Sequence, residues 1–320
     1  AFQLTDRRPV RQRPLKWARS AFRDLAAQHS YFTKSEILRE TAIRSQSEGV
    51  SVARIIRTTD QFLARDSEVS EVAKEHFTSK KNLEIEAELL NVVKRLSKQH
   101  GHRLHVSELE QKLIDQSGSE TEVLNWEQSS AVAHLTIGDG DIAIVNGKAG
   151  TGKTRMLKTA AGLWKEAGYK VVGACVSGKA ARGLSEATGI QTDTVAKLLY
   201  DANRSVATSA NHHLRQLSNA AQGRKSAQYR PVFRLDEKSI LVLDEAAMIG
   251  TQDLQGILSE AERAKAKVVM VGDASQLQPI APGNPFQSLI DRLGAVRIDK
   301  VVRQQDSFDR QVVNDLSVGN

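Results

Sequence analysis

Three short clusters of polar residues in this chain have the types and spacing needed to bind and cleave a triphosphate. The first is the segment 147–154, GKAGTGKT, which follows the apolar run 142–145 and leads into a helical pattern. Glycines in such a loop let backbone N–H groups close around a β-phosphate, while the lysine ammonium lies between the β- and γ-phosphates and the threonine hydroxyl binds Mg²⁺. The segment therefore predicts a nucleotide-binding loop formed by Gly147, Ala149, Gly150, Thr151, Gly152, Lys153 and Thr154.

A pair of acidic residues forms the second cluster. Asp244 and Glu245 follow residues 239–243, SILVL, which read as a buried parallel strand. At the end of such a strand we expect Asp244 to hold Mg²⁺ through water and Glu245 to orient or deprotonate the water that attacks the γ-phosphate. The alternative is a surface acidic pair that caps a strand. The phosphate loop at a fitting distance upstream favours the catalytic interpretation.

The third cluster follows another apolar run, residues 267–271. It reads GDASQLQPI over residues 272–280 and contains Gln276, a neutral donor suited to contact a γ-phosphate. A turn glutamine beside a proline is the plainer alternative. In an open parallel α/β sheet, ligands bind outside the carboxyl ends of the strands. We therefore expect the loop, the acidic pair and Gln276 to converge around one triphosphate.

Together these motifs resemble those of superfamily 1 helicases, and the resemblance extends to three further segments. Residues 124–132, LNWEQSSAV, are similar to the Q motif, which implies that Gln128 reads the adenine edge. Residues 174–182, ACVSGKAAR, are similar to motif Ia, which holds single-stranded DNA on the first motor domain. Residues 301–305, VVRQQ, resemble motif IV, which implies that Arg303 approaches the γ-phosphate.

The sequences of these motifs, taken together, look like the RecD-like helicase part of conjugative relaxases. The likeness is strong from about residue 120 to residue 310 and weaker in residues 31–38 and 77–84, which resemble the region that links relaxase to motor. It implies a 5′-to-3′ helicase that uses ATP and Mg²⁺ and unwinds the transferred plasmid strand. The implied partners are single-stranded DNA and, through a longer parent polypeptide, conjugation-machinery proteins.

The resemblance also implies that half of a motor is missing. The sequence ends soon after Arg303, before a second RecA-like domain, and it starts with Ala1, so both ends read as cuts through a longer polypeptide. In such motors ATP is hydrolysed between two domains, and opening and closing of the cleft drives translocation. We expect weak nucleotide binding and slow hydrolysis from this chain alone. A RecD-like repair helicase fragment and a non-catalytic module that grips single-stranded DNA stay open as alternatives.

Contacts with DNA are expected to come from backbone binding and base stacking, because such motors do not read base edges. Ser177, Lys179 and Arg182 are the leading candidates for phosphate contacts, and Thr194 is a further candidate. Phe286 is a candidate for base stacking, although a buried aromatic that anchors the helix at 286–290 is the favoured alternative.

Two histidines and one tyrosine invite a relaxase interpretation that the residues around them do not support. His100 and His102 have no Asp, Glu or Cys at ligand spacing, so we interpret them as a solvated helix C-terminus, where cationic side chains suit the dipole. Tyr31 reads as a packing aromatic and not as a nucleophile. It stands before Thr33, which with Glu36 three residues later predicts a capping box at the start of a helix.

Composition bounds the class of protein. The chain has 320 residues, enough for two domains, and a single cysteine, which excludes an internal disulfide. Its net charge is +7, and basic residues crowd residues 7–23 and 204–234. Such tracts raise affinity for phosphate backbones or else mark a solvated surface. No apolar stretch is long enough to cross a bilayer and no signal core is present, so we expect a cytoplasmic location without a membrane partner.

The chain is expected to hold three parts. Residues 1–30 read as a basic arm, and residues 31–118 as a helical, winged-helix-like linking module with candidate strands at 61–64 and 75–78. Residues 119–320 read as an α/β, RecA-like P-loop ATPase domain with an insertion at about 201–235. Its apolar runs alternate with helical segments, the pattern of a parallel sheet covered on both faces. The expected strands are 142–145, 171–176, 240–243, 268–271 and 295–298.

Overall fold

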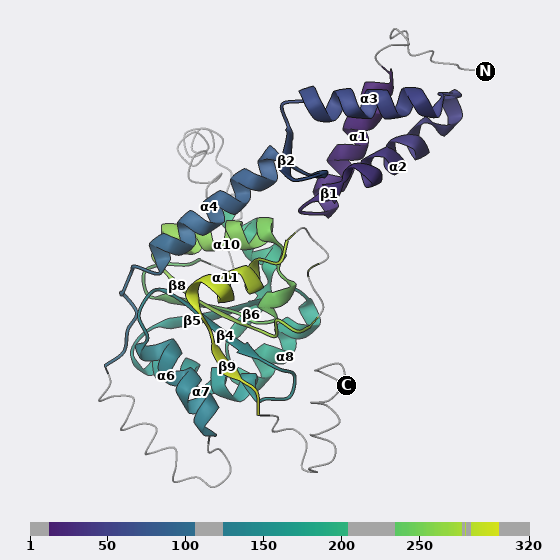
Figure 1. The fold of residues 1–320 in the computed structure, drawn as a ribbon. Coiled ribbons are helices and arrows are strands. Elements are labelled where there is room, and N and C mark those ends of the chain that lie inside the picture. Colours follow the sequence, from purple (N-terminus) through teal and green to yellow (C-terminus); the bar gives the residue numbers. More distant parts are fainter. Residues whose placement is uncertain (1–12, 106–123, 204–233, 277–278, 280–282, 301–320) are drawn as a thin grey trace, which may run out of the picture. The chain divides into compact units, whose positions relative to one another are not determined.

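The computed structural model describes residues 13–105, 124–203, 234–276, 279 and 283–300 (Figure 1). The chain divides into two compact units, the first formed mainly by residues up to Glu88 and the second mainly by residues from Leu89 onward. The division lies within helix α4, Lys80–Leu96, and so comes earlier in the chain than the boundary expected near residue 118. That expected boundary and most of the expected insertion lie outside the described residues.

The described part of the first unit contains three α-helices, a 3-10 helix, the first half of α4 and a small antiparallel sheet. Strand β3 lies between β1 and β2 and pairs antiparallel with both. The structure confirms the expected helical module, and its order of one strand among the helices followed by a hairpin is that of a winged helix. In chain order the elements are α1 (Arg13–Gln28), β1 (Phe32–Thr33), α2 (Lys34–Ser45), η1 (Gln46–Glu48), α3 (Val52–Arg65), β2 (Val69–Ala73) and β3 (His76–Ser79).

Aromatic rings build the core of this unit. Phe22 lies edge to face against Phe32 and Phe62, with ring centroids 5.3 and 5.5 Å apart, a geometry that adds about 0.5–1.5 kcal/mol per pair to the burial of the rings. Thr33 begins α2 with the expected capping box: its hydroxyl accepts from the Glu36 N–H, and the Glu36 carboxylate accepts from the Thr33 N–H. These hydrogen bonds from Thr33 hold the pKa of Glu36 below its ordinary value.

The described part of the expected basic arm is structured. Residues 13–28 form α1, and only residues 1–12 lie outside the described residues. Ala18, Phe22 and Leu25 recur at helical spacing and enter the core of the unit. The expected arm of residues 1–30 therefore includes a helix that packs into the unit, because this apolar stripe outweighs the charges around it.

The candidate strand at residues 61–64 is also wrong. These residues belong to α3, where Phe62 lies seven residues after Ile55 on the buried side of the helix. A four-residue window shows too little of this spacing to separate a helix from a strand. The second candidate, residues 75–78, overlaps β3.

In its described residues the second unit is an α/β domain with a six-stranded sheet. The strands lie in the order β6-β5-β7-β8-β4-β9, and every neighbouring pair is parallel. This arrangement confirms the expected parallel-sheet P-loop fold. Its elements after α4 are α6 (Trp126–Ile137), β4 (Ile142–Gly147), α7 (Lys153–Glu166), β5 (Lys170–Cys175), α8 (Gly178–Thr188), β6 (Gln191–Thr194), β7 (Ser239–Leu243), η2 (Ala246–Met248), α10 (Thr251–Ala264), β8 (Lys267–Gly272), α11 (Pro285–Leu293) and β9 (Val296–Ile298).

Helices cover both faces of the sheet (Figure 1). Along β7, Ile240 and Val242 enter the core under α6, α7 and α8, while Leu241 and Leu243 enter the core under α10 and α11. Because both faces are buried, each central strand reads as a continuous apolar run and not as an alternating one. Among the described helices, none combines the length and apolar character that crossing a membrane requires.

One strand of the parallel sheet was not expected from the sequence. The five expected strands are present as β4, β5, β7, β8 and β9, and β6 is added at the edge of the sheet. Its sequence, QTDT, contains no apolar residue, and its side chains are exposed or half-buried. An edge strand needs only one hydrogen-bonded neighbour and little burial, so hydrophobicity does not reveal it.

The pairing of β6 with β5 yields a prediction about stability. Gly173 stands opposite Thr192, and a Cβ added to Gly173 would lie 2.4 Å from Thr192 Oγ1. We expect Gly173→Ala to lower the free energy of unfolding by about 1–3 kcal/mol, the usual cost of overpacking. Chemical denaturation measures this change.

The matched control is Gly162→Ala in α7, where the added methyl meets open space. This substitution should leave stability unchanged or raise it by up to about 1 kcal/mol, because alanine is the better helix former. Thr192→Ala should restore most of the stability that Gly173→Ala loses. Equal effects of the two glycine substitutions would contradict the proposed clash.

Candidate nucleotide-binding site

A cavity of about 540 Å³ lies where β4, β7 and β8 end. Its size is within the range of small-molecule sites. The three polar clusters expected to converge all contribute to its wall, since parallel strands bring their carboxyl ends to one edge of the sheet. The lining residues are Ala149, Gly150, Gly152, Lys153, Thr154, Arg155, Lys158, Ala187, Asp244, Glu245, Gly272, Asp273 and Gln276.

Glycines shape the loop after β4. Gly150 and Gly152 have φ angles of 81° and 85°, a region that residues with a Cβ rarely adopt. The Lys153 ammonium turns back into the loop and donates to the carbonyl oxygens of Gly147 and, at 2.9 Å, Lys148. Helix α7 begins at the same point, so its N–H groups and the positive end of its dipole add to the attraction for an anion.

The acidic pair at the end of β7 lies in unfavourable electrostatic surroundings. Burial raises the pKa of Asp244, and the Glu245 N–H and the Lys153 charge offset this only in part. Burial and then the neighbouring Asp244 raise the pKa of Glu245, against the Lys153 charge. Glu245 also adopts φ 55° and ψ 33°, a left-handed conformation that costs a non-glycine residue about 1–3 kcal/mol and is found at functional sites.

The oxygen atoms beside this pair fit a magnesium ion. Thr154, in the first turn of α7, and Asp244, directly after β7, line the same cavity, and hydroxyl and carboxylate oxygens are ligands that Mg²⁺ accepts together with water and phosphate. A bound cation would also compensate the carboxylate charge that burial disfavours. Such an ion would neutralise the charge that develops on the phosphates during cleavage.

The residues after β8 are held by their own hydrogen bonds. Asp273 is buried and accepts from the N–H of Ser275 at 3.0 Å and from its hydroxyl at 2.6 Å. The Asn146 side chain, at the end of the neighbouring β4, accepts from the Ala274 N–H at 3.1 Å. This turn presents the exposed Gln276 to the cavity. The contact of Gln276 with a γ-phosphate stays a prediction.

Gln128 occupies a place that sequence reasoning did not anticipate. Its side chain is buried, its Oε1 accepts from the Asn125 N–H at 3.0 Å, and its Nε2 donates to the Thr151 carbonyl at 2.9 Å. Both ends of the amide are thus engaged, one in the capping box of α6 and the other in the phosphate loop. The role in adenine recognition stays a prediction, while the structure shows Gln128 holding the loop.

The neighbouring Glu127 reaches the end of β9. Its carboxylate accepts from the N–H groups of Asp299 and Lys300, at 2.9 Å each. Arg303, three residues further on, lies outside the described residues, so its approach to the γ-phosphate stays a prediction. The first turn of α6 therefore contacts both the phosphate loop and the segment that leads to Arg303.

The expected phosphate contacts for DNA cluster at the start of α8. Ser177 is the N-cap of this helix and accepts from the Ala180 N–H at 3.1 Å, and Lys179 and Arg182 are exposed in its first turns. Thr194 ends the adjacent β6, where its hydroxyl accepts from the backbone of a following helical segment. Ser177, Lys179 and Arg182 follow β5, and Thr194 ends the neighbouring β6, so all four lie at the same edge of the sheet. Their contact with DNA stays a prediction.

The prediction that Phe286 stacks on a DNA base is contradicted by its position. Its ring is completely buried at the start of α11, and a Cβ added to Gly272 would lie 2.9 Å from it. A ring without an exposed face cannot stack on a base. The favoured alternative, a buried aromatic that anchors the helix, agrees with this position.

The interpretation of the histidines as a solvated helix end is wrong for His102. Helix α4 ends at Leu96, and His102 lies beyond it, buried, with Nδ1 2.8 Å from Asp141 Oδ1 and Nε2 3.0 Å from the Glu237 carbonyl. Its partner Asp141 is far away in sequence, so the local pattern gave no sign of it. Among the described residues, no group of three His, Cys, Asp or Glu side chains is placed to hold a metal ion.

The buried acid at the end of β7 yields a second prediction. Because burial raises the pKa of Asp244, the ionised carboxylate costs stability above its folded pKa, and the cost vanishes once pH falls below the ordinary aspartate pKa of about 3.9. Asp244→Asn keeps an oxygen for the Glu245 N–H and removes the charge. We expect this variant, without nucleotide, to melt at a higher temperature than the wild type at pH 7.

Calorimetry or circular dichroism across pH measures the difference, which should shrink as the solution is acidified. Asp253→Asn on the exposed surface of α10 is the control and should change stability by less than about 0.5 kcal/mol. A lower melting temperature of Asp244→Asn at neutral pH would show that the carboxylate stabilises the fold.

Comparison with known proteins finds relatives in DNA transfer. The conjugal transfer protein TraA of Rhizobium radiobacter is 36% identical over 209 residues, which cover 65% of this chain and 16% of that protein. The probable conjugal transfer protein TraA of Sinorhizobium fredii is 33% identical over 244 residues, which cover 76% of this chain and 19% of that protein. The chain thus spans less than a fifth of the length of these relatives.

Other similar proteins are helicases. The ATP-dependent RecD2 DNA helicase of Deinococcus radiodurans is 29% identical over 181 residues, 57% of this chain and 22% of that protein. The crystal structure of the Pif1 helicase from Candida albicans superposes with a TM-score of 0.42 and 19% identity, over 62% of this chain and 44% of that one. A family model described as an AAA domain matches residues 123–320. The chain, with more than half of its length matched and the whole cavity inside the match, belongs to the AAA domain family.

Proposed function

We propose that this chain is the ATPase motor part of a DNA helicase that acts in conjugative DNA transfer and moves 5′ to 3′ on single-stranded DNA. The names of its relatives support the setting, since conjugal transfer proteins and an ATP-dependent DNA helicase are among them. One observation carries the chemistry: Lys153, the Asp244–Glu245 pair and Gln276 line a single cavity with the phosphate loop.

Each of these residues has a part in transferring the γ-phosphoryl group to water. The loop N–H groups and the Lys153 ammonium hold the β- and γ-phosphates. Thr154 and Asp244 would hold Mg²⁺, and a bound Mg²⁺ would supply positive charge beside the phosphates. Glu245 positions the attacking water, and its raised pKa brings it closer to the value at which a general base works near neutral pH.

The nucleotide site and the proposed DNA contacts are connected through neighbouring strands at the edge of the sheet. The Asp244 N–H donates to the Ala174 carbonyl at 3.1 Å, so the end of β7 is tied to β5. Two residues beyond β5 comes Ser177, the first of the proposed phosphate contacts. Movement of the acidic pair when the γ-phosphate leaves would therefore reach the first turn of α8 through one shared backbone contact.

The proposal is tested by two substitutions that separate binding from catalysis. Glu245→Gln should bind ATP with an affinity close to that of the wild type and lower kcat by about 10²–10⁴-fold, the usual contribution of a general base. Lys153→Ala should lose nucleotide binding itself. Binding is measured by calorimetry and turnover by phosphate release, with and without single-stranded DNA.

Asp253→Asn, on the surface of α10, serves again as the control and should match the wild type in both assays. DNA binding without nucleotide binding would favour a gripping module over a motor. Unchanged turnover in Glu245→Gln would remove that residue from the mechanism.

Gln128→Ala distinguishes the two roles open to that residue. If the amide holds the phosphate loop, its loss should lower the binding affinities for ATP, GTP and inorganic tripolyphosphate by similar factors. The substitution should also leave the Thr151 carbonyl without its Gln128 partner, at a cost of about 1–3 kcal/mol in stability. If the amide reads the adenine edge, only ATP binding falls. We expect the first outcome, because both ends of the side chain already have partners. A selective loss of ATP in competition titrations would reverse this assignment.

A further inference from the structure

In the winged-helix unit, basic residues predominate on helices α1 and α3, and acidic residues predominate in the β2–β3 hairpin. Helices α1 and α3 carry seven basic and two acidic residues. The turns and strands of the β2–β3 hairpin, residues 66–76, carry four acidic residues and one lysine. A phosphate backbone is attracted to the first surface and repelled by the second. Any nucleic acid that meets this unit would therefore lie against the helices and not against the hairpin.

An exposed ridge runs along α3. Ala53, Arg57, Gln61 and Ala64 follow one another at helical spacing and are all exposed, while Ile55, Thr58, Thr59 and Phe62 face the core. Within the described residues the Arg57 side chain makes no hydrogen bond or ion pair. The acidic residue beside the ridge, Asp60, pairs with Lys34 at 2.7 Å. The ridge thus presents an arginine and a glutamine between two small residues, with the neighbouring negative charge neutralised.

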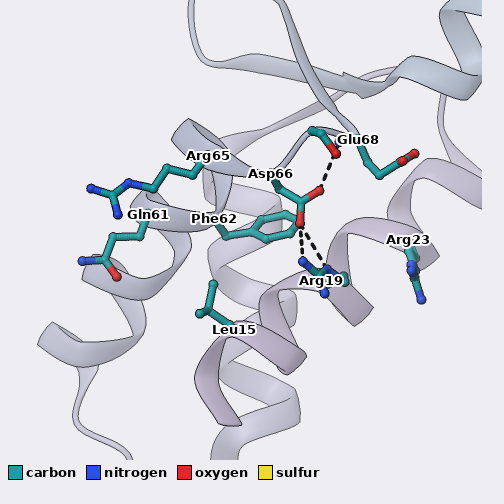
Figure 2. Close-up of a pocket in the computed structure, with 9 residues that line it drawn as sticks. Leu15, Arg19, Arg23, Gln61, Phe62, Arg65, Asp66 and Glu68 are labelled. Carbon is teal, nitrogen blue, oxygen red and sulfur yellow. Dashed lines mark hydrogen bonds and ion pairs between the residues drawn. The ribbon is translucent and has the colours of Figure 1, made fainter. Parts of the chain in front are cut away.

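The junction of α1 and α3 holds the two basic helices together (Figure 2). Both Nε and a terminal nitrogen of Arg19 donate to Asp66, at 3.1 and 2.7 Å, and Asp66 ends α3. Arg65 and Gln61 point away from this ion pair, and Arg23 points away from it along α1 (Figure 2). A hollow of about 450 Å³ lies between these side chains. Arg19 is therefore engaged in structure, and Arg23 and Arg65 present their charges outward on either side.

These side chains fit duplex DNA better than a single strand. Single strands are held by aromatic side chains on which bases stack, and in the described parts of α1 and α3 the rings of Phe22 and Phe62 are buried and that of Trp17 is half-buried. A major groove of about 12 Å admits a helix, where arginine pairs with guanine, glutamine with adenine, and apolar groups with the thymine methyl. The exposed Val52 and Ile56 supply such apolar groups at the start of α3.

We propose that α3 of this unit enters the major groove of double-stranded DNA, with Arg57 and Gln61 at the base edges and Arg23 and Arg65 at the flanking phosphates. This site is separate from the nucleotide cavity and its single-strand contacts. It would give the chain a hold on duplex DNA that needs neither nucleotide nor a free strand. The acidic hairpin would stay off the backbone, so this docking uses helices alone.

The test is duplex binding by the full chain with Arg57 changed. Fluorescence anisotropy with a labelled closed DNA hairpin, which offers no single-stranded end, is measured without nucleotide. Arg57→Glu should weaken binding by about tenfold or more, the worth of one good base-edge contact. Arg23→Ala should lower the slope of log affinity against log salt by about one, as loss of one phosphate contact requires.

Arg39→Glu provides the matched control, because Arg39 is an exposed arginine on α2 whose carboxylate neighbour, Glu40, lies 3.6 Å away. It should bind the hairpin within about twofold of the wild type, since its charge lies off the proposed surface. Melting curves confirm that each variant is folded, and Arg57→Gln replaces Arg57→Glu if the latter is not. Wild-type binding in the Arg57 variants, or an equal loss in Arg39→Glu, overturns the proposal. An equal loss for hairpin and single strand overturns the assignment to duplex DNA.

Discussion

The nucleotide site rests on an electrostatic imbalance at the end of β7. Two adjacent carboxyl groups, Asp244 and Glu245, lie where burial raises the pKa of each, and the nearby Lys153 charge compensates only part of the cost. Glu245 is held in a left-handed backbone conformation as well. Such an arrangement persists only where surrounding structure imposes it. The imposing structure is the parallel sheet, whose buried strands fix where the pair, the phosphate loop and the turn after β8 must meet.

This imbalance has a thermodynamic consequence. A cation that enters the cavity with a phosphate chain would supply the missing countercharge, so part of the cost of burying the acids would be recovered on binding. A ligand that binds only the folded state stabilises it by mass action. The strain at Glu245 and the charge of Asp244 therefore lower the stability of the protein by itself and favour its complex. Functional sites commonly lower the stability of a protein in this way.

Sequence reasoning located the parts of the site that depend on local chemistry. A glycine-rich loop between a strand and a helix, and acidic residues directly after a buried run, specify both their own conformation and their place at the sheet edge. The partners of Gln128 and His102 could not be found in this way, because Thr151 and Asp141 are distant in sequence. Strand β6 escaped notice because polar residues at a sheet edge show no periodicity. Phe286 was ambiguous because the sequence around a phenylalanine in the first turn of a helix is the same whether its ring is buried or exposed.

The two units differ in what fixes their functional surfaces, and magnitudes decide which contacts matter in the first. The Arg19–Asp66 pair is partly exposed, and such pairs contribute about 0–1 kcal/mol. Burial of a Phe side chain contributes about 1.5–3 kcal/mol, and Phe22 of α1 packs against Phe62 of α3. The aromatic core, and not the ion pair, therefore sets the angle between the two basic helices. The ion pair engages Arg19, while Arg23 and Arg65 point away from it, so the core fixes the helices and these two arginines are the charges that the unit presents outward.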